Sequence, residues 1–336
     1  MEFAPFDPRT APAADYEAIT GLRARMHAVD RPGTPPFSLA ATIELMTSDD
    51  GAAMGPRTFW TARDGDALVG FAMVTLPDRE NTDMAIVFLE VGLDRRRQGI
   101  GTAFLRALLP SLQASGRPRI LAANVTSGSD GELFAEATGL DCTYRGLMQT
   151  LVVESVDPVL WDVAAPDGYR LYGWTDAAPE ELIVSYAEAR KAIADAPSQG
   201  LTWEETDWTP QRVRDDEAAV AAAGQDYRIV VAVHEDSGEV AGFTELVIRP
   251  GDPDHARQMD TAVRKEHRGH GLGRAIKAEM MRRLVADRPG LARVSTATAS
   301  DNVYMAGVNR SIGYVDVRSL AYWETATADL ATRFGN

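Results

Sequence analysis

Two glycine-rich segments of the chain have the residue types that can hold a phosphate group. They read Arg96-Arg97-Gln98-Gly99-Ile100-Gly101-Thr102 and Arg268-Gly269-His270-Gly271-Leu272-Gly273-Arg274. Each follows an apolar stretch typical of a strand and precedes a helical pattern. The first N–H groups of a helix lack partners, and the helix dipole is positive there. Glycine also lets the backbone approach a ligand closely. Both segments are therefore predicted to bind an anion such as a pyrophosphate.

The two segments belong to an internal repeat. Val91 and Gly99 recur 172 residues later as Val263 and Gly271, and a Gly-Phe pair upstream of each recurs at the same offset. A repeat of this length is too long for a solenoid and indicates a duplicated domain. A length of 336 residues also suits two domains. We expect domains at residues 1–155 and 156–336.

Other phosphate-binding motifs fit these segments less well. A Walker loop ends in Gly-Lys-Ser/Thr, which neither segment has, and a dinucleotide fingerprint comes early in a βαβ unit. Basic residues gather at both segments of this acidic chain, as Arg95–Arg97 in the first and as Arg264, Lys265, His267, Arg268, His270, Arg274 and Lys277 in the second. This local charge favours an anionic ligand.

Each copy is predicted to contain the same series of elements. Helices are expected at 14–28 and 179–194, and again at 38–47 and 209–223. A strand hairpin follows, at 227–233 and 240–248 in the second copy, and a third strand ends at Val91 or Val263. A helix then starts at the glycines, followed by a strand at 119–125 or 292–297, a short helix and a last strand. This mixture predicts an α/β (α+β) fold with helices on both faces of a sheet.

Composition restricts the class of partner. The net charge of −15 argues against nucleic acid or an anionic membrane. One cysteine, Cys142, excludes an intrachain disulfide, and we expect it to be buried. No Cys/His cluster has zinc-like spacing, so we expect no metal. The N-terminus does not resemble a signal peptide and no apolar run reaches about 18 residues, so we expect a cytoplasmic protein. The oligomeric state is left open.

These residues resemble the GNAT superfamily of N-acetyltransferases. That family has a strand-ending valine, then R/Q-x-x-G-x-G/A opening a helix, and later an Asn-containing helix ending in Gly-Phe or Gly-Tyr. The second copy matches through Val263, Arg268, Gly271 and Gly273, then Asn302 and Gly313-Tyr314; the first matches through its loop and ends more weakly in Gly139-Leu140. The paired arrangement resembles actinobacterial tandem GNAT proteins, some from antibiotic gene clusters such as that for clavulanic acid.

The resemblance implies two GNAT domains in tandem, each with a mixed, mostly antiparallel sheet whose central strands splay apart. It also implies acetyl-CoA as the acyl donor, one molecule per domain, with pantetheine in the gap. The residues that it assigns to CoA binding are Glu90, Val91, Gly92, Arg96, Arg97, Gln98, Gly99, Ile100, Gly101 and Thr102 in the first copy, and Ala262, Val263, Arg268, Gly269, His270, Gly271, Leu272, Gly273, Arg274 and Asn302 in the second.

The copies depart differently from the family pattern. Many members carry a tyrosine four residues before the final Gly-Phe/Tyr pair, as the acid for the leaving thiolate. That position is Asn309 in the second copy and Ala135 in the first, which also lacks the counterpart of Asn302. We therefore expect the second copy to be the catalyst, and the CoA of the first to be structural or regulatory.

Catalytic candidates come from the second copy. A protonated amine must lose a proton before it attacks, and a positioned base assists this typically 10²–10⁴-fold. Glu245 interrupts an apolar strand and is the first choice, with Asp260 and His255 as alternatives; water is another acceptor of the proton. Tyr304 or Asn309 is the candidate partner of the leaving thiolate.

The connection at 195–208 is expected to cover the acceptor site in this fold. Trp203, Glu204 and Glu205 could hold a cationic amine by charge and cation–π contact; an exposed acidic loop is the alternative. The sequence thus favours an acetyl-CoA-dependent N-acetyltransferase acting on a small primary amine, in secondary metabolism. A non-catalytic acyl-CoA-binding or sensing protein, and a transferase of a larger acyl group such as succinyl, remain alternatives.

Overall fold

A computed structural model describes residues 1–48 and 54–335, which form two compact units. Unit 1 comprises Met1–Gly146, Ser198–Glu204 and Arg318–Asn336, and unit 2 comprises Leu147–Pro197 and Glu205–Val317. Neither unit is an uninterrupted stretch of chain. The sequence copies 1–155 and 156–336 therefore do not coincide with the compact units, because each unit takes a segment from the other copy.

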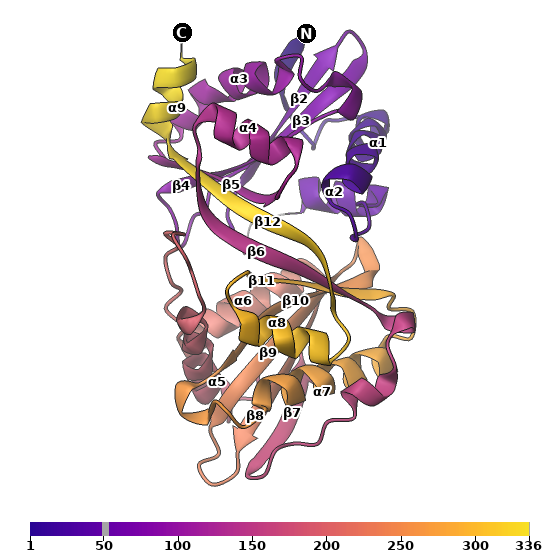
Figure 1. Ribbon diagram of the computed structural model, residues 1–336, viewed down its shortest axis with the longest axis vertical. Coiled ribbons are helices and arrows are strands. Elements are labelled where there is room, and N and C mark those ends of the chain that lie inside the picture. The colour runs from indigo at the N-terminus through magenta and orange to yellow at the C-terminus, as the bar shows by residue number, and fades with distance from the viewer. Residues whose placement is uncertain (49–53, 336) are drawn as a thin grey trace. The chain divides into compact units, whose positions relative to one another are not determined.

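Unit 1 is a mixed sheet with helices on both faces (Figure 1). Its strands lie in the order β1-β2-β3-β4-β5-β12-β6. Helices α1 and α2 pack over Phe59 and Phe71 on one face, and α3 and α9 cover the other. The elements are β1 (Glu2–Phe6), α1 (Ala13–Asp30), α2 (Leu39–Thr47), β2 (Arg57–Asp64), β3 (Ala67–Thr75), β4 (Met84–Val91), α3 (Ile100–Ala114), β5 (Arg119–Thr126), α4 (Asp130–Thr138), β6 (Asp141–Val152), β12 (Val315–Ala326) and α9 (Thr327–Phe334).

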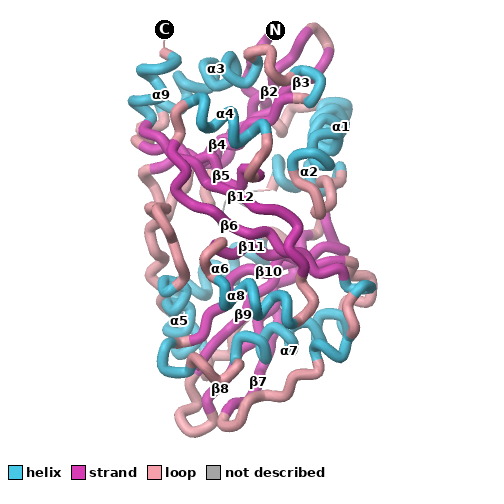
Figure 2. Tube along the Cα trace, in the orientation of Figure 1, coloured by secondary structure: helices cyan, strands magenta, loops and turns pink. Residues whose placement is uncertain are grey.

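Unit 2 repeats the plan, with strands in the order β6-β11-β10-β9-β8-β7. Helix α5 and Trp208 pack on one face, and α7 packs on the other. Figure 2 shows both helices beside the strands of this unit. Its elements are β7 (Tyr169–Thr175), α5 (Ile183–Arg190), the short 3₁₀ helix η5 (Lys191–Asp195), α6 (Pro210–Ala222), β8 (Asp226–His234), β9 (Val240–Arg249), β10 (Asp252–Val263), the 3₁₀ helix η6 (Lys265–His267), α7 (Leu272–Asp287), β11 (Arg293–Ala299) and α8 (Val303–Ser311).

The last strands of the two sequence copies are exchanged. β12 ends the second copy, yet Leu320–Ala326 pairs antiparallel with β5 of unit 1, where Figure 1 shows it in yellow. β6 ends the first copy, but its residues from Leu147 onward belong to unit 2, beside β11. Each sheet is therefore completed by chain from the other copy.

In both units a pair of parallel strands starts joined and then separates. β4 pairs with β5 over Met84–Ile86, and β10 pairs with β11 over His255–Arg257. The remaining residues of β4 and β10 stay paired with β3 and β9 on the other side. β10 also contains a bulge between Gln258 and Thr261. The sheets are mixed and mostly antiparallel, as the resemblance implied.

The repeated Gly-Phe pairs have a structural reason. Gly70 lies opposite Val91 across β3 and β4, and Gly242 lies opposite Val263 across β9 and β10. A Cβ on Gly242 would lie 3.0 Å from the Ala262 carbonyl oxygen, and one on Gly70 would lie 3.1 Å from that of Glu90. Glycine therefore allows the neighbouring backbone to approach where each central strand ends.

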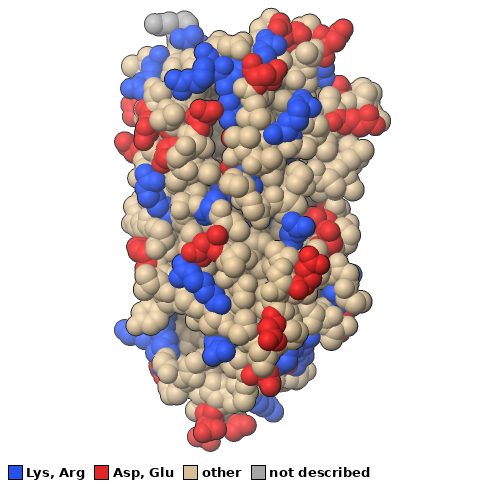
Figure 3. All heavy atoms as spheres, turned by 45° about the vertical axis from the view of Figure 1, so that its right-hand side comes forward, with Lys and Arg blue, Asp and Glu red and all other residues tan. Residues whose placement is uncertain are grey.

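Most of the expected elements are confirmed, within a few residues at their ends, but β1, β7 and α9 were not predicted. One prediction about burial was wrong: Cys142 is exposed, near the start of β6. Within the described residues, no helix has the length and apolar character to cross a membrane. Acidic and basic side chains are interspersed on the face shown in Figure 3.

Candidate functional site

The two glycine loops adopt the same backbone conformation. Arg97 and Gly99 have φ of 59° and 79°, and their counterparts Gly269 and Gly271 have φ of 86° and 79°. Alternating left-handed residues turn successive N–H groups toward one point, which makes an anion-binding concavity. No side chain caps α3 or α7, and neither first turn carries an acidic residue. The N–H groups that open both helices are therefore available to an anionic ligand.

The first arginine of each loop fixes the loop to its own unit. Arg96 donates from Nε to the Val91 carbonyl oxygen at 3.1 Å, and Arg268 does the same to Val263 at 2.9 Å. Arg96 also forms an ion pair with Asp30, the last residue of α1, and Arg268 pairs with Asp195, the last residue of η5. These guanidinium groups hold the loop against the strand and the first helical segment, and their contact with CoA stays a prediction.

The groups beside the two loops differ. In unit 1, Arg95 pairs with Asp64 at 2.6 Å. In unit 2, three of the chain's five histidines, His234, His267 and His270, surround Tyr169. The Tyr169 hydroxyl lies 2.9 Å from His267 Nδ1, and burial is the main cause of the lowered pKa of His267. A cluster of imidazole and phenol rings therefore lies beside the loop of unit 2, where unit 1 has an ion pair.

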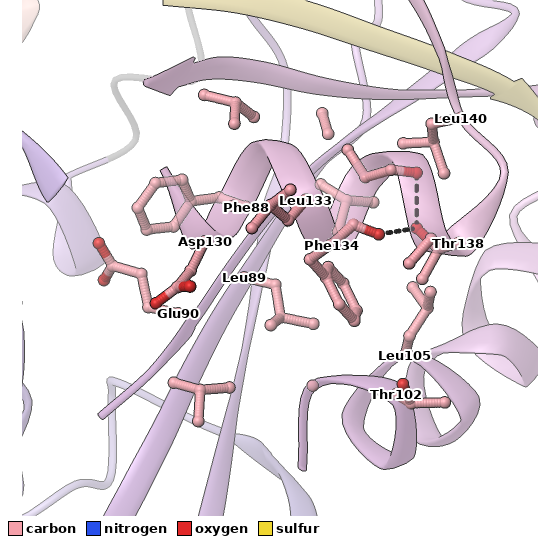
Figure 4. A pocket seen from close by; sticks show the side chains of 18 of the residues that line it. Phe88, Leu89, Glu90, Thr102, Leu105, Asp130, Leu133, Phe134, Thr138 and Leu140 are labelled. Atoms are coloured by element: carbon pink, nitrogen blue, oxygen red, sulfur yellow. Dashed lines mark hydrogen bonds between the residues drawn. The ribbon is translucent and has the colours of Figure 1, made fainter. Parts of the chain in front are cut away.

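A cavity of about 450 Å³ opens from the loop of unit 1 (Figure 4). Its walls are the separated parts of β4 and β5, the first turns of α3, and α4. Its lining includes Gly99, Gly101 and Thr102, and continues to apolar side chains such as Leu105, Phe134 and Leu140. In Figure 4, Glu90 and Asp130 lie at one side of the pocket and Leu140 and Thr138 at the other. The anion-binding loop and an apolar channel between strands are therefore continuous, which fits a phosphate-headed ligand with a long arm.

The equivalent region of unit 2 contains a buried lysine. Lys277 occupies the position on α7 that Leu105 occupies on α3, and it is 1% exposed. Its Nζ lies 3.5 Å from Thr261 Oγ1 and 5.6 Å from the centre of the Tyr314 ring. Burial lowers the pKa of Lys277 to about 7. Tyr314 Oη is buried without a hydrogen-bond partner in the described chain.

On the opposite face of unit 2, buried charges gather around Glu245. Its Oε1 accepts from the Tyr186 hydroxyl at 2.6 Å and lies 3.1 Å from Arg190 Nε, and its Oε2 accepts from Arg190 Nη2 at 3.2 Å. Burial raises the pKa of Glu245 to about 7, opposed by Arg190 and assisted by Asp260. Asp260 is half-buried in the β10 bulge, and burial raises its pKa as well. Only Glu245 forms an ion pair with Arg190, and Asp260 lies close enough for its charge to interact with the same guanidinium.

The other predicted CoA-binding residues lie on or beside the loops. Glu90 is on β4 in an ion pair with Arg23, and Gly92 donates its N–H to the Val69 carbonyl oxygen. Asn302 caps α8 by accepting from the Met305 N–H. The structure also places in or next to the loops Val91, Arg97, Gln98, Ile100, Thr102, Ala262, Val263, Gly269, His270, Leu272, Gly273 and Arg274.

The candidate partners of the thiolate occupy contrasting environments. Tyr304 is 88% exposed on the first turn of α8. Asn309 is fully buried, and its Nδ2 donates to Gln149 Oε1 at 2.7 Å while its Oδ1 has no partner in the described chain. His255 lies between Asp252 and Ser295, which hold both ring nitrogens. Of these groups, only Asn309 combines burial with a free polar atom.

The acidic connection takes a different path from the one expected. Residues Ser198–Glu204 belong to unit 1, where the Glu204 carboxylate accepts from the Asn81 N–H at 2.9 Å. Trp203 is 42% exposed, and Glu205 begins the next part of unit 2. The tryptophan face nearest a cation is that of Trp208, under Arg190 at 3.4 Å. Trp203 and Glu204 therefore belong to the compact unit that consists mostly of the other sequence copy, and their role at an acceptor site stays a prediction.

Sequence reasoning missed Tyr186 and Arg190, and it placed Lys277 among the basic residues of the second loop without expecting its burial. All three are buried, on helices whose apolar spacing predicts a buried face, so their positions were a usable signal. Lys277 lies four residues after Gly273 and four before Met281, which places it on the buried face of α7.

Comparison with known proteins identifies the family. The pattern of the acetyltransferase (GNAT) family matches residues 26–131 and 193–314. This chain belongs to the GNAT family. Its two matched regions contain the two glycine loops. Membership supports acyl-CoA N-acyltransferase activity and acyl-CoA as the group that the loops hold.

Solved structures agree with this. A tandem GNAT protein from the clavulanic acid biosynthesis pathway is 25% identical, with a TM-score of 0.77 over 97% of this chain and 98% of that one. A GCN5-related N-acetyltransferase from Sphaerobacter thermophilus is 17% identical, with a TM-score of 0.71 over 97% and 96%. A putative acetyltransferase from Pyrococcus horikoshii, 13% identical, has a TM-score of 0.56 over 96% and 89%. Curated proteins yield no match.

Proposed function

We propose that this GNAT protein transfers an acetyl group from acetyl-CoA directly to a primary amine of a small molecule, and that unit 2 is the catalytic unit. The observation that carries the proposal is the charge on the acceptor face of unit 2. Two carboxylates, Glu245 and Asp260, interact with the single guanidinium of Arg190. A protonated amine brought to that face supplies the missing positive charge.

Asp260 is the better placed of the two carboxylates to meet the amine. Both oxygens of Glu245 are already engaged, and the side chain is 2% exposed, whereas Asp260 is half-buried in the bulge where β10 and β11 have separated. Glu245 then acts as a positioning residue that fixes Arg190 near Asp260. We therefore propose Asp260, instead of Glu245, as the first candidate for the general base.

The acetyl group passes directly from CoA to the amine, and no acyl-enzyme forms. The ammonium loses a proton to Asp260 or to water, and the neutral nitrogen attacks the thioester carbonyl carbon. The new C–N bond forms as the C–S bond breaks, and the proton that the acylated nitrogen then loses ends on the leaving thiolate, so the products are the neutral amide and CoA with a free thiol. At pH 7 an alkyl amine with pKa near 10.4 is about 0.04% neutral, a cost of roughly 4.6 kcal/mol that a base partly offsets.

Unit 1 is proposed to hold acyl-CoA without turning it over. Its glycine loop has the backbone conformation of an anion site, and the cavity that continues from the loop can accommodate the rest of acyl-CoA. On the corresponding face, however, unit 1 carries Arg23 and Arg31 beside Glu90, with Arg318 near Arg31, and this positive charge disfavours the approach of a cationic amine. The similarity to a tandem GNAT protein of clavulanic acid biosynthesis supports a role in secondary metabolism.

Matched loop variants test the binding sites. Asn and Asp both tolerate left-handed backbone, and a Cβ at Gly99 or Gly271 meets open space. Gly99→Asp and Gly271→Asp each place a carboxylate where the pyrophosphate binds, while Gly99→Asn and Gly271→Asn make the same shape without charge. In native mass spectrometry with acetyl-CoA, we expect two bound molecules for the wild-type chain and one for each Asp variant. Two bound molecules in both Asp variants would contradict the assigned loops.

Release of the free CoA thiol tests which of the two units catalyses the transfer. With acetyl-CoA and a panel of small primary amines, we expect turnover by the Gly99→Asp chain and none by Gly271→Asp. Asp260→Asn should lower turnover about 10²-fold or more, with unchanged acetyl-CoA binding. Tight binding with no thiol release for any amine would favour the non-transferring alternative, and the reverse pattern between loop variants would make unit 1 the catalyst.

A further inference from the structure

Three arginines of unit 1 converge on the acceptor face of β4. Arg23 comes from α1, Arg31 directly follows α1, and Arg318 comes from β12. Arg23 and Arg31 both contact Glu90 and lie over the Phe88 ring, and Arg318 donates to Thr126, whose hydroxyl donates to the carbonyl of Asp30, next to Arg31. Burial and the positive charges of Arg31, Arg23 and Arg318 lower the pKa of His27 to about 4. The ring stays neutral, with Nε2 at 2.8 Å from Thr34 Oγ1. Three guanidinium groups therefore surround one buried location.

The described residues supply too little negative charge for this cluster. Glu90 pairs with Arg23 at 3.1 Å and with Arg31 at 3.8 Å. Arg318 donates instead to neutral oxygens, Asn124 Oδ1 at 2.7 Å and Thr126 Oγ1 at 3.0 Å. The neighbouring Asp30 pairs with Arg96, which Asp130 also contacts at 3.2 Å. With Arg96 included, four guanidinium groups thus face three carboxylates, Glu90, Asp30 and Asp130, which leaves one positive charge in excess.

Aromatic rings support the cluster without neutralising it. Arg23 lies 4.7 Å from the centre of the Phe37 ring, and Arg31 lies 4.7 Å from that of Phe88. Cation–π contacts are attractive, but a ring carries no net charge. Burial, together with Arg31, lowers the pKa of Arg318 to about 10. The excess charge therefore remains.

Hydrogen-bond donors of the cluster are also unused. Arg23 is 7% exposed and Arg318 is 8% exposed, and neither Arg23 Nη1 nor Arg318 Nε has an acceptor within the described chain. Buried guanidinium N–H groups are costly to leave unpaired. A ligand that brings both negative charge and acceptor oxygens would satisfy them.

The cluster borders the cavity that opens from the glycine loop. Arg31 and Glu90 line that cavity directly, as do Asn124 and Thr126, the two residues that Arg318 holds. Figure 4 shows Glu90 and Phe88 at one side of the pocket, away from Leu140 and Thr138. A ligand with its phosphates on the loop can therefore extend an end toward the arginines.

We propose that the arginine end of the unit 1 cavity binds a carboxylate. Planar guanidinium groups match the two oxygens of a carboxylate better than any other small anion of single charge. The carboxylate belongs either to the acyl group of a dicarboxylic acyl-CoA or to a free small acid beside CoA. The first source rests on the proposed binding of CoA by unit 1, and the second does not.

Binding of three probes to the full chain carrying Gly271→Asp tests the proposal, since the thioesters are then held by unit 1. We expect succinyl-CoA to bind at least about 10-fold more tightly than acetyl-CoA if the acyl group carries the carboxylate. If the acid is free, succinate binds the acetyl-CoA-loaded chain instead. Arg31→Gln and Arg318→Gln, each checked by melting temperature, should remove either effect and leave acetyl-CoA affinity within about 3-fold. The exposed Arg9→Gln is the matched control.

The outcomes separate this proposal from the proposed function. Equal affinity for the two thioesters, together with no binding of succinate, overturns the carboxylate site even when acetyl-CoA binds normally. A preference for succinyl-CoA that survives both arginine variants overturns it too. If acetyl-CoA fails to bind this chain, CoA binding by unit 1 is wrong, and the titration with succinate alone decides on the arginine cluster.

Discussion

The variant Lys277→Met tests how much the buried charge of Lys277 destabilises the folded chain. Methionine keeps the unbranched shape of the lysine side chain and removes its charge. Lys277 is 1% exposed, and burial lowers its pKa from 10.5 to about 7. A shift of about 3.5 units corresponds to about 5 kcal/mol at 1.36 kcal/mol per unit. We therefore expect the methionine variant to be more stable than the wild-type chain.

The sign of the pH dependence follows from linkage. The unfolded chain keeps the proton of Lys277 up to about pH 10, whereas the folded chain releases it near pH 7. Between these values the unfolded state binds more protons, so wild-type stability rises with pH. The advantage of Lys277→Met should be largest at pH 6, at about 5 kcal/mol, and should fall to about 2 kcal/mol by pH 9.

Urea denaturation from pH 6 to pH 9 measures this difference. The matched control is Lys191→Met, which removes an exposed lysine paired with Glu188 and should show no such trend. The chain has three lysines, Lys191, Lys265 and Lys277. Selective ¹³Cε-lysine labelling should therefore give three NMR signals, of which one titrates near pH 7. Three signals titrating near pH 10, or a methionine variant less stable at pH 6, would refute the argument.

Three further outcomes are expected. Arg96→Gln should lower the free energy of unfolding by about 2 kcal/mol, because it removes a part-buried bond to Val91 and the pair with Asp30; unchanged urea midpoints would contradict this. Acetyl-CoA affinity of unit 2, measured in the Gly99→Asp chain, should rise as pH falls below 6.5, because His267 beside its glycine loop, whose pKa burial lowers from 6.5, gains a positive charge there. A pH response as large in unit 1, measured in the Gly271→Asp chain, would exclude that cause. Residues 1–155 alone should not unfold cooperatively, because β5 then lacks β12; a sharp thermal transition would show the exchange to be dispensable.

The fold and the loops were readable from sequence because each rests on a local pattern. The 172-residue offset fixed both glycine loops, and the structure gives the paired positions the same left-handed backbone. Strand exchange left no such signal, since β6 and β12 carry the same alternation whichever unit they complete. The path of residues 198–204 depends on contacts such as Glu204 with Asn81, 123 positions apart in the sequence. The exposure of Cys142 likewise depends on which neighbour covers β6.

The exchange of strands also explains part of the difference in charge beside two loops that share the same backbone conformation. Arg318 belongs to the second sequence copy, yet β12 carries it into unit 1, where its guanidinium holds Asn124 and Thr126 at the cavity wall. The arginine cluster is therefore complete only when both copies are present in one chain. Unit 2 receives no matching cation from β6 among the described residues, and its acceptor face keeps two carboxylates to one guanidinium. The two loops have the same backbone conformation, so phosphate binding does not distinguish the units. We therefore infer that the difference in charge between the two acceptor faces determines whether a cationic amine or a carboxylate binds there.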